Sequence, residues 1–460
     1  MLITLSYILI HICRTSLACG VEQRIGVKML FNSRSSEGTS MHSRRFPITA
    51  AIGFSLASMG LFSMVASAAE LSPDQLLKKA QAEQPAYLDT VRQLVDIDTG
   101  TGQAIGLKTV SAMLVERLKA LGAEVSTTPA EPSAGDNIVG TFEGNGTRSF
   151  LLMVHYDTVF GPGTAAKRPF RLDSERAYGP GVADAKGGVA MILHALQLLQ
   201  NEQFKAFGTL TVLFNPDEET GSSGSKKVIA ELARQHDYVF SYEPPDKDAV
   251  TVATNGINGL ILDVKGKSSH AGSAPEAGRN AAIELAHQLL QLKDLGDPDK
   301  GTTVNWTLIK GGEKRNIIPS SASAEADMRY SDLSESDRVL ADGQRMVKKT
   351  LVDGTEVTLR MEKGRPPLAR NPGSEQLAKT AQTLYQKTGR TLEPIAMRFG
   401  TDAGYAYVPG SAKPAVLETM GVVGAGLHAD DEYIELSSIA PRLYLTVALI
   451  TQLSKGDATP

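Results

Sequence analysis

Three short, largely apolar runs constrain the fold of this 460-residue chain more than any other feature. They cover residues 150–154, 209–214 and 238–241. A strand is apolar along its whole length when helices cover both faces of its sheet, as in a parallel sheet. A helix with one apolar stripe is predicted over 186–200, between the first two runs. This alternation predicts an α/β fold with a doubly wound, mostly parallel sheet.

A different order of elements is predicted between about residues 256 and 366. The expected order is strand, helix, strand, strand, helix, strand, over 259–265, 279–292, 302–309, 321–330, 334–350 and 355–362. This β-α-β-β-α-β order is typical of a ferredoxin-like α+β unit. Glycine and proline mark both joints, at Asn255-Gly256 and at Gly364-Arg365-Pro366-Pro367. We therefore expect an inserted lid or dimerisation domain over 256–366, within a catalytic domain formed by 69–255 and 367–460.

The first 68 residues have the pattern of a leader. Arg44 and Arg45 precede an apolar stretch over 48–65, and the small residues 66–68 resemble a cleavage site. This predicts a periplasmic or secreted protein after cleavage near Ala68.

Other interpretations of the leader stay open. An uncleaved membrane anchor is one alternative, because 47–65 carries no charge and approaches the length of a membrane span. Residues 43–46 loosely resemble a twin-arginine export signal. Met41 is a second candidate for the start of translation, preceded by an overextended segment.

Charge and cysteine content exclude two classes of function. The net charge of −4 provides no basic field for a nucleic acid, so we expect a small-molecule or peptide substrate. Cys13 and Cys19, the two cysteines of the chain, both fall in the leader. The rest of the chain therefore has no thiol for catalysis or for cysteine-ligated metal.

Metal-binding types of side chain follow each of the three apolar runs. His155 and Asp157 follow the first run, Glu218 and Glu219 the second, and Glu243 the third. The carboxyl ends of parallel strands meet at one edge of a sheet, where ligand groups gather. Imidazole and carboxylate donors suit a pair of borderline metal ions such as zinc. The pattern therefore predicts a two-zinc hydrolase.

Each of these residues has a structural alternative when it is considered alone. His155 could be a core histidine held by Asp157, and Asp184 could cap the helix that follows it. Glu243 and His428 could be turn residues. Three further histidines fall in helical contexts where we expect no catalytic role: His194, His236 and His287. The combination of the remaining residues favours a metal site.

Several stretches resemble a known family, the co-catalytic zinc metallopeptidases that include glutamate carboxypeptidase, succinyl-diaminopimelate desuccinylase and aminoacylase. The stretches are Ala177-Tyr178-Gly179-Pro180-Gly181, Thr211-Val212-Leu213-Phe214-Asn215, Asn305-Trp306-Thr307 and Asn316-Ile317-Ile318-Pro319. The resemblance extends from about Glu83 to Leu453 and is strongest to the bacterial glutamate carboxypeptidases that cleave folates. It implies hydrolysis of the amide bond to a C-terminal glutamate or similar amino acid.

The resemblance also implies a role for individual residues. The zinc ions, two per subunit, would be bound by His155, Asp184 and Glu243 and by Asp184, Glu219 and His428. Glu218 would be the general base, with Asp157 orienting His155. His270 would stabilise the oxyanion from the inserted domain, in several relatives in the active site of a partner subunit. Asn305 and Arg329 would contact the substrate carboxylate.

One departure from the family concerns the acyl side of the substrate. Folate-cleaving relatives have a run of glycines where this chain has Arg398, Phe399 and Gly400, directly before Thr401. We expect Arg398, Gly400 and Thr401 to contact the substrate, which leaves the preferred acyl group open. An N-acyl-amino-acid deacylase or dipeptidase with the same metals is the alternative enzyme.

A periplasmic binding protein is the alternative from a different class, although adjacent Glu218 and Glu219 argue against it, because binding alone needs no spare base. We also expect a homodimer through the inserted domain, since a ferredoxin-like unit has an edge strand and exposed helices that could pair.

Overall fold

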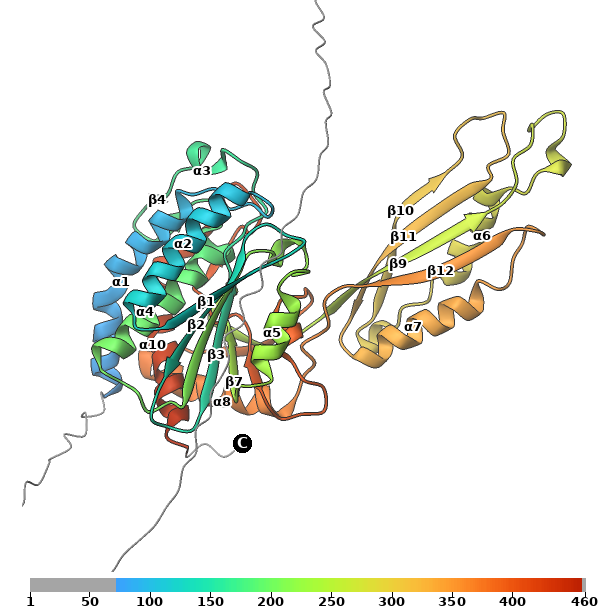
Figure 1. Cartoon of the computed structure of the whole chain (residues 1–460). Helices are drawn as coiled ribbons and strands as arrows, with labels where there is room; N and C mark the ends of the chain where they lie inside the picture. The colour runs from blue at the N-terminus through green and yellow to red at the C-terminus, as the bar shows by residue number, and fades with distance from the viewer. Residues whose placement is uncertain (1–71, 457–460) are drawn as a thin grey trace, which may run out of the picture. The chain divides into compact units, whose positions relative to one another are not determined.

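A computed structural model of the chain describes residues 72–456 (Figure 1). The predicted leader, its cleavage site near Ala68 and both cysteines lie outside the described residues. Helix α1 (Pro73–Val95) opens the described part. Ser72 and Gln75 cap this helix reciprocally, because the side chain of each accepts a hydrogen bond from the backbone N–H of the other.

The central sheet has six strands in the order β1-β2-β6-β3-β7-β14. Their bounds are β1 (Glu124–Pro129), β2 (Asp136–Glu143), β6 (Thr209–Asn215), β3 (Ser149–His155), β7 (Tyr238–Ser241) and β14 (Ala415–Leu417). Strands β6, β3, β7 and β14 run parallel to one another, as predicted for most of the sheet. Strands β1 and β2 form an antiparallel hairpin on the edge of β6, which the sequence did not predict.

Helices cover both faces of this sheet, which explains the apolar runs. In β3, Phe150, Leu152 and Val154 face one core, and Leu151 and Met153 face another. The first core contains residues of α1, α2 (Ala104–Ala120), α4 (Gly188–Asn201), α8 (Pro372–Tyr385) and α10 (Leu436–Ser454). The second contains residues of α5 (Lys226–Ala233) and α9 (Ala403–Ala406). Figure 1 shows α5 across the sheet from α2 and α4.

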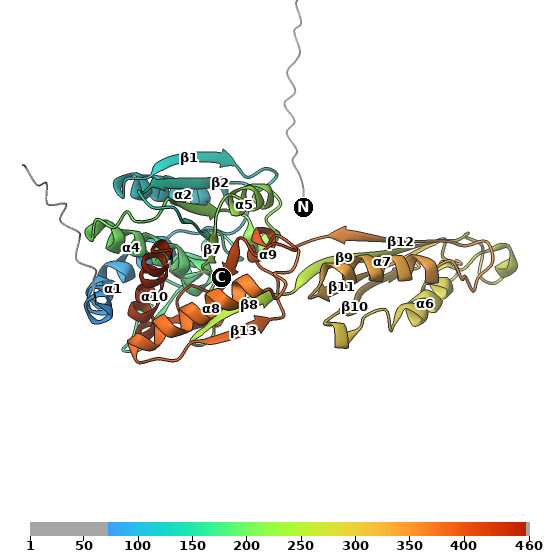
Figure 2. The ribbon, with the colours of Figure 1, turned by 90° about the horizontal axis from the view of Figure 1, so that it is seen from below.

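Two small sheets complete this part of the chain. β8 (Ala249–Thr254) and β13 (Glu393–Met397) form a parallel pair, which lies beside α8 in Figure 2. The other is antiparallel, in the order β15-β16-β5-β4. Its strands are β15 (Gly424–Ala425), β16 (Tyr433–Glu435), β5 (Arg176–Tyr178) and β4 (Arg171–Leu172). In this sheet β5 pairs with β16, which lies about 250 residues further along the chain, and Tyr178 is opposite Tyr433.

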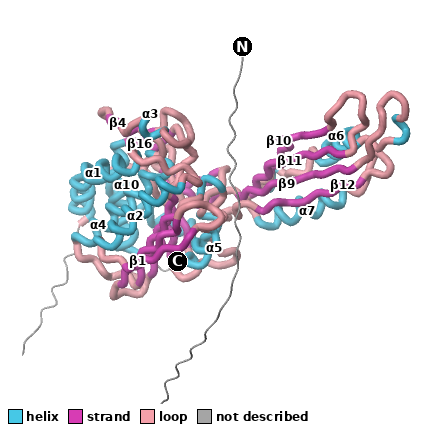
Figure 3. The backbone as a smooth tube through the Cα atoms, turned by 45° about the horizontal axis from the view of Figure 1, so that its top comes forward, coloured by secondary structure: helices cyan, strands magenta, loops and turns pink. Residues whose placement is uncertain are grey.

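A larger antiparallel sheet, called the second sheet from here on, has the order β10-β11-β9-β12 (Figure 3). Its elements follow the predicted order along the chain: β9 (Gly256–Lys265), α6 (Ala281–Leu292), β10 (Thr303–Gly311), β11 (Ser321–Tyr330), α7 (Leu333–Met346) and β12 (Glu356–Lys363). Apolar residues of α6 and α7 share one core with alternate residues of these strands. The boundaries of a separate inserted domain at 256 and 366 stay a prediction.

Within residues 72–456, two segments are long and apolar enough to cross a membrane, Val182–Asn201 and Leu436–Ser454. In the 18-residue apolar window of each segment, 94% and 72% respectively is buried within the protein. Both are therefore explained as core helices.

Candidate metal centre

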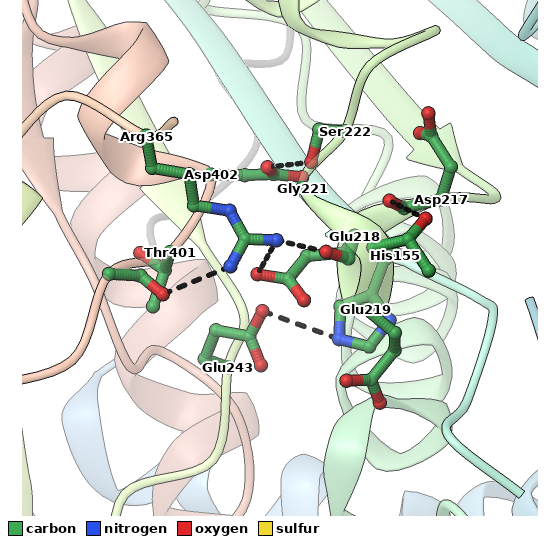
Figure 4. A network of polar contacts seen from close by, with 12 residues as sticks. His155, Asp217, Glu218, Glu219, Gly221, Ser222, Glu243, Arg365, Thr401 and Asp402 are labelled. Atoms are coloured by element: carbon green, nitrogen blue, oxygen red, sulfur yellow. Dashed lines mark hydrogen bonds and ion pairs between the residues drawn. The ribbon is translucent and has the colours of Figure 1, made fainter. Parts of the chain in front are cut away.

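The predicted ligands of the central sheet lie at one edge of it, because their strands are parallel neighbours. His155 is the last residue of β3. Glu218 and Glu219 lie in the turn that follows β6, and Glu243 follows β7. Since β6, β3 and β7 are adjacent, the three strand ends bring imidazole and carboxylates into one cluster (Figure 4).

Asp184 and His428 reach the same cluster from loops. Asp184 lies in an irregular turn over Val182–Gly187 that precedes α4, so it does not cap this helix. The start of α4 packs tightly against the end of β7, since a Cβ on Gly188 would lie 2.2 Å from the carbonyl oxygen of Tyr242. His428 lies between β15 and β16 with a positive φ of 63°, an uncommon conformation for a residue other than glycine.

The two carboxylate oxygens of Asp184 face different imidazoles. Oδ1 lies 3.1 Å from Nε2 of His155, and Oδ2 lies 3.2 Å from Nε2 of His428. A second carboxylate completes each group: Glu243 Oε1 is 3.4 Å from the same nitrogen of His155, and Glu219 Oε2 is 3.3 Å from that of His428. The structure therefore brings together all five predicted ligands in two groups that share Asp184.

Asp157 contacts residues that carry this cluster. Its Oδ1 lies 3.2 Å from Nδ1 of His155, the ring nitrogen that faces away from Asp184. Asp157 also accepts hydrogen bonds from the backbone N–H groups of Glu218 and Glu219 and from the hydroxyl of Thr101. It thus orients His155 and fixes the turn that carries both glutamates.

Glu432 holds the loop of Asp184. Its carboxylate is almost fully buried and accepts hydrogen bonds from the backbone N–H groups of Gly181, Ala183 and Asp184, at 2.7, 2.9 and 3.0 Å. Because Glu432 lies four residues beyond His428, it ties the loops of two predicted ligands together.

Glu218 has a different environment from Glu219. Its Oε1 lies 2.8 Å from Nη2 of Arg365, which also donates to the carbonyl oxygen of Glu218. The second terminal nitrogen of Arg365, Nη1, donates to the carbonyl oxygen of Gly400 at 3.2 Å. Glu218 also lies close enough to His155 and Glu243 for the three to hold a cation.

Burial dominates the electrostatics of the acids. It raises the pKa of Glu219 to about 7 and that of Glu243 to about 8. It also raises the pKa of Glu218 well above the ordinary value, although the guanidinium of Arg365 opposes this shift. Several buried acids thus crowd one site, and a bound cation would relieve their repulsion.

The histidines and Asp184 stabilise one another. Burial would raise the pKa of Asp184, but hydrogen bonds from His155 and His428 hold it below its ordinary value. The hydrogen bond to Asp184 is the main cause that raises the pKa of His428 to about 9. Burial opposes the charged form of His155, yet Glu243 and the neighbouring aspartates raise its pKa well above the ordinary value.

The predicted residues of the second sheet lie apart from this cluster along the chain. His270 follows β9, Asn305 lies on β10 and Arg329 on β11. Among the described residues, no hydrogen bond or ion pair joins any of the three to the five predicted metal ligands. Asn305 pairs in register with Asp327, which in turn binds Arg329 through two hydrogen bonds of 2.8 and 3.0 Å.

The three residues predicted on the acyl side have different environments. Arg398 is exposed. Gly400 is buried and accepts the hydrogen bond from Arg365. Thr401 is buried, and its hydroxyl donates to Glu418 at 2.9 Å.

Two of the three helical histidines have structural partners. His194 lies within hydrogen-bonding distance of Glu83 and Thr90, and His236 of the carbonyl oxygen of Leu232 and the hydroxyl of Thr211. These contacts account for both residues without a catalytic role.

The sequence motifs do not indicate Arg365 and Glu432 as parts of the site. Arg365 stands among the glycine and prolines that mark a joint, although a charged residue at a joint is itself a signal. Glu432 follows His428 within an acidic run, which conceals a buried carboxylate among exposed ones.

Comparisons with known proteins identify relatives of the chain. Residues 151–452 match the sequence profile of peptidase family M20/M25/M40. Carboxypeptidase G2 from Pseudomonas sp. (strain RS-16) is 41% identical over 387 residues, covering 83% of this chain and 92% of that protein. Acetylornithine deacetylase from Proteus mirabilis (strain HI4320) is 31% identical over 267 residues, covering 53% and 67%. The solved structure of aminopeptidase PepT from Bacillus cereus ATCC 10987 shares the fold, with a TM-score of 0.68 at 22% identity and coverage of 80% and 98%.

Proposed function

The chain belongs to peptidase family M20/M25/M40, and we propose that it is a two-zinc carboxypeptidase that releases a C-terminal glutamate or similar amino acid. Membership confirms the family predicted from the sequence motifs, and the chain is a hydrolase. The observation that carries the proposal is the position of Asp184, whose two oxygens face two separate groups of donors.

We assign His155, Asp184 and Glu243 to one zinc ion and Asp184, Glu219 and His428 to the other. The donor types support this assignment, because imidazole nitrogen and carboxylate oxygen are preferred zinc ligands. Oε1 of Glu219 is buried without a hydrogen-bond partner among the described residues, which suits a ligand atom. Bound zinc would lower the pKa of a water molecule and polarise the scissile carbonyl group.

Glu218 is the general base in this proposal. It lies beside the cluster, and no assigned ligand role uses its carboxylate. Glu218 would accept the proton of the attacking water and pass it to the leaving nitrogen. Asp157 keeps both the imidazole of His155 and the backbone of Glu218 in place during this transfer.

His270 would donate a hydrogen bond to the oxyanion. Its Nδ1 accepts hydrogen bonds from the backbone N–H groups of Gly272 and Ser273, both at 3.1 Å. A neutral imidazole that accepts at Nδ1 carries its proton on Nε2. The tautomer therefore suits a donor at the exposed end of the ring.

Recognition of the substrate carboxylate falls to Arg329 and Asn305. Asp327 occupies the Nε and Nη2 edge of the Arg329 guanidinium, so Nη1 is left to face a ligand. Asn305 lies opposite Asp327 in the neighbouring strand, which places its amide on the same face of the sheet. A planar guanidinium held in this way binds carboxylate with a defined orientation.

The substrate class follows from the relatives and from the acyl-side residues. The relative that shares 41% identity is a carboxypeptidase, which favours release of a C-terminal amino acid. Arg398 and Phe399 are exposed near Gly400 and Thr401, where we expect contact with the acyl group. The similarity to acetylornithine deacetylase supports an N-acyl-amino-acid deacylase as the second candidate.

Metal analysis combined with a hydrolysis assay tests the proposal. We expect two zinc ions per subunit and release of glutamate from folate by the purified protein. A panel of N-acylated amino acids that vary in both acyl group and C-terminal residue separates the two candidates. Full zinc loading without hydrolysis of any member of the panel would contradict the proposed activity.

We also propose that the protein is a homodimer through the second sheet. β10 is an edge strand, and four large apolar side chains on it and on α6 are 51–70% exposed: Ile283, Leu290, Leu308 and Ile309. Apolar side chains next to an unpaired strand edge suit pairing with a second copy. Light scattering should give the dimer mass, and Leu290→Lys should give the monomer mass.

Export is the remaining proposal, based on the sequence of the leader alone. Cleavage near Ala68 would leave a mature protein that begins close to α1 and lacks both cysteines. Mass spectrometry of the N-terminus of the secreted protein tests this. Residues before Ala66 on the mature protein would contradict the cleavage site.

A further inference from the structure

We propose that Arg365 is a positioning residue that keeps the carboxylate of Glu218 out of the neighbouring metal position and available as a base. This inference rests on the proposed function of Glu218. It assigns a role to a residue that lies outside the predicted ligand and substrate sets.

The contacts of Arg365 leave Glu218 little freedom. Nη2 of Arg365 lies 2.8 Å from Oε1 of Glu218 and also donates to the carbonyl oxygen of the same residue. The backbone N–H of Glu218 donates to Asp157 at 3.1 Å. In Figure 4 the guanidinium of Arg365 lies between Glu218 and the chain at Thr401. Both ends of the pair are shielded, with 12% and 9% of the side chains exposed.

Glu218 needs such a restraint because it lies within reach of a metal ion. One donor atom each of His155, Glu218 and Glu243 lies within 4.8 Å of the other two. The same criterion selects His155, Asp184 and Glu219, which are three of the assigned ligands. Judged by distance alone, Glu218 and Glu219 are therefore equally suitable as metal ligands.

A carboxylate bound to a metal ion is a weaker base, because the positive charge of the ion lowers its affinity for a proton. The guanidinium of Arg365 competes with the cation for Glu218, because it balances the negative charge of the carboxylate through an ion pair of 2.8 Å. Glu219 has no such partner among the described residues, and its nearest charged neighbour is His428 at 3.3 Å. The difference between these adjacent glutamates thus lies in Arg365.

Arg365 is itself anchored at the joint with the second sheet. Its carbonyl oxygen accepts a hydrogen bond from the N–H of Ile257 at 2.8 Å, and the N–H of Gly364 donates to the side chain of Asn258 at 3.0 Å. Nη1 is bound to the carbonyl oxygen of Gly400. Since backbone and side chain are both fixed, the guanidinium is a rigid support for Glu218.

The decisive variant is Arg365→Met, which keeps much of the side-chain length and removes the charge. We expect Glu218 to turn towards the metal and add a charged donor, so zinc affinity in competition with a chelator should rise about 10-fold or more. The kcat for folate should fall about 10²–10⁴-fold, as for loss of a general base, with KM changed much less. In Arg365→Met combined with Glu218→Gln, zinc affinity should return to that of Glu218→Gln alone.

Two further variants serve as controls. Arg370→Met removes an exposed arginine a few residues along the chain and should leave zinc affinity and kcat unchanged. Arg365→Lys should recover part of kcat, because an ammonium group can reach one oxygen of Glu218. If Arg365→Met does not fold, Arg365→Lys and rescue of Arg365→Ala by added guanidinium ion give the same comparison.

Other outcomes would overturn the inference. A rise in KM with kcat and zinc affinity unchanged would make Arg365 a substrate contact. Unchanged values for all three would leave it a structural residue. If Glu218→Gln alone loses zinc, the proposed function of Glu218 fails; if Glu218→Gln keeps zinc and loses turnover, only the role of Arg365 is at stake.

Discussion

The carboxylate of Glu432 accepts a hydrogen bond of 3.0 Å from the backbone N–H of Asp184. Two more N–H groups of the same loop, from Gly181 and Ala183, bind the same carboxylate. The residue that faces both imidazoles is thus positioned through its backbone by an acid near His428.

Replacing Glu432 should weaken metal binding without removing a ligand. In Glu432→Gln the side chain keeps one acceptor oxygen, and its NH2 group would face a backbone N–H. Residues that support metal ligands typically affect affinity about 10–100-fold, so we expect a loss of that size in a chelator competition. Asp431→Asn, at the exposed neighbouring position, is the matched control and should retain full affinity.

Replacing Glu218 should separate catalysis from metal binding. We expect Glu218→Ala to lower kcat by about 10²–10⁴-fold, the contribution typical of general acid–base catalysis. Zinc content, measured by mass spectrometry, should stay unchanged. Loss of one zinc ion would instead identify Glu218 as a ligand and reverse the roles of the two adjacent glutamates.

Replacing Arg329 should weaken recognition of the substrate carboxylate. A hydrogen bond to a charged group contributes about 1.5–3 kcal/mol, so Arg329→Ala should lower kcat/KM about 10–100-fold, mainly through KM. Arg345→Ala, an exposed arginine on α7, is the control. An unchanged kcat/KM in Arg329→Ala would remove this residue from the substrate site.

The stability of the protein should fall with acid partly through His236. Burial lowers the pKa of His236 in the folded state, whereas the unfolded residue takes up a proton near pH 6.5. The contribution of His236 to the free energy of unfolding is complete above about pH 6.5 and is lost as the pH falls through the pKa of the folded state. The free energy of unfolding changes by at most about 1.4 kcal/mol per pH unit from this residue. His236→Gln should therefore show a shallower decline in the free energy of unfolding between pH 7 and 5, and an identical slope would contradict this.

Removing the metal should lower thermal stability. Without cations, the buried acids of the cluster repel one another, and a ligand that binds only the folded state stabilises it by mass action. We expect a chelator to lower the melting temperature and added zinc to restore it. The shift should be smaller in Glu219→Gln than in the parent protein, and equal shifts would argue against Glu219 as a ligand.

The main sheet and the ligands at its strand ends were predictable because their signals are local. A strand covered on both faces must be apolar throughout, so the runs that end near His155 and Glu243 could be located. Parallel neighbours then place their carboxyl ends at one edge, whatever the intervening sequence contains.

The contacts that depend on long-range packing were not predictable. The strands of the β1-β2 hairpin have mixed polarity, and those of the small sheet that joins β5 to β16 are at most three residues long, so alternation gives little signal in either. Arg365 pairs with Glu218 across 147 positions of the chain. No spacing rule relates two such residues, since only the folded path of the joint brings them together.

The two ends of the segment that forms the second sheet lie side by side, with the N–H of Ile257 bonded to the carbonyl oxygen of Arg365. Such a segment can be exchanged for that of a relative without replacing any of the five assigned metal ligands. Grafting of this kind would alter which molecules the enzyme selects while its reaction chemistry is inherited, provided that the graft retains Arg365 and the assigned oxyanion donor His270.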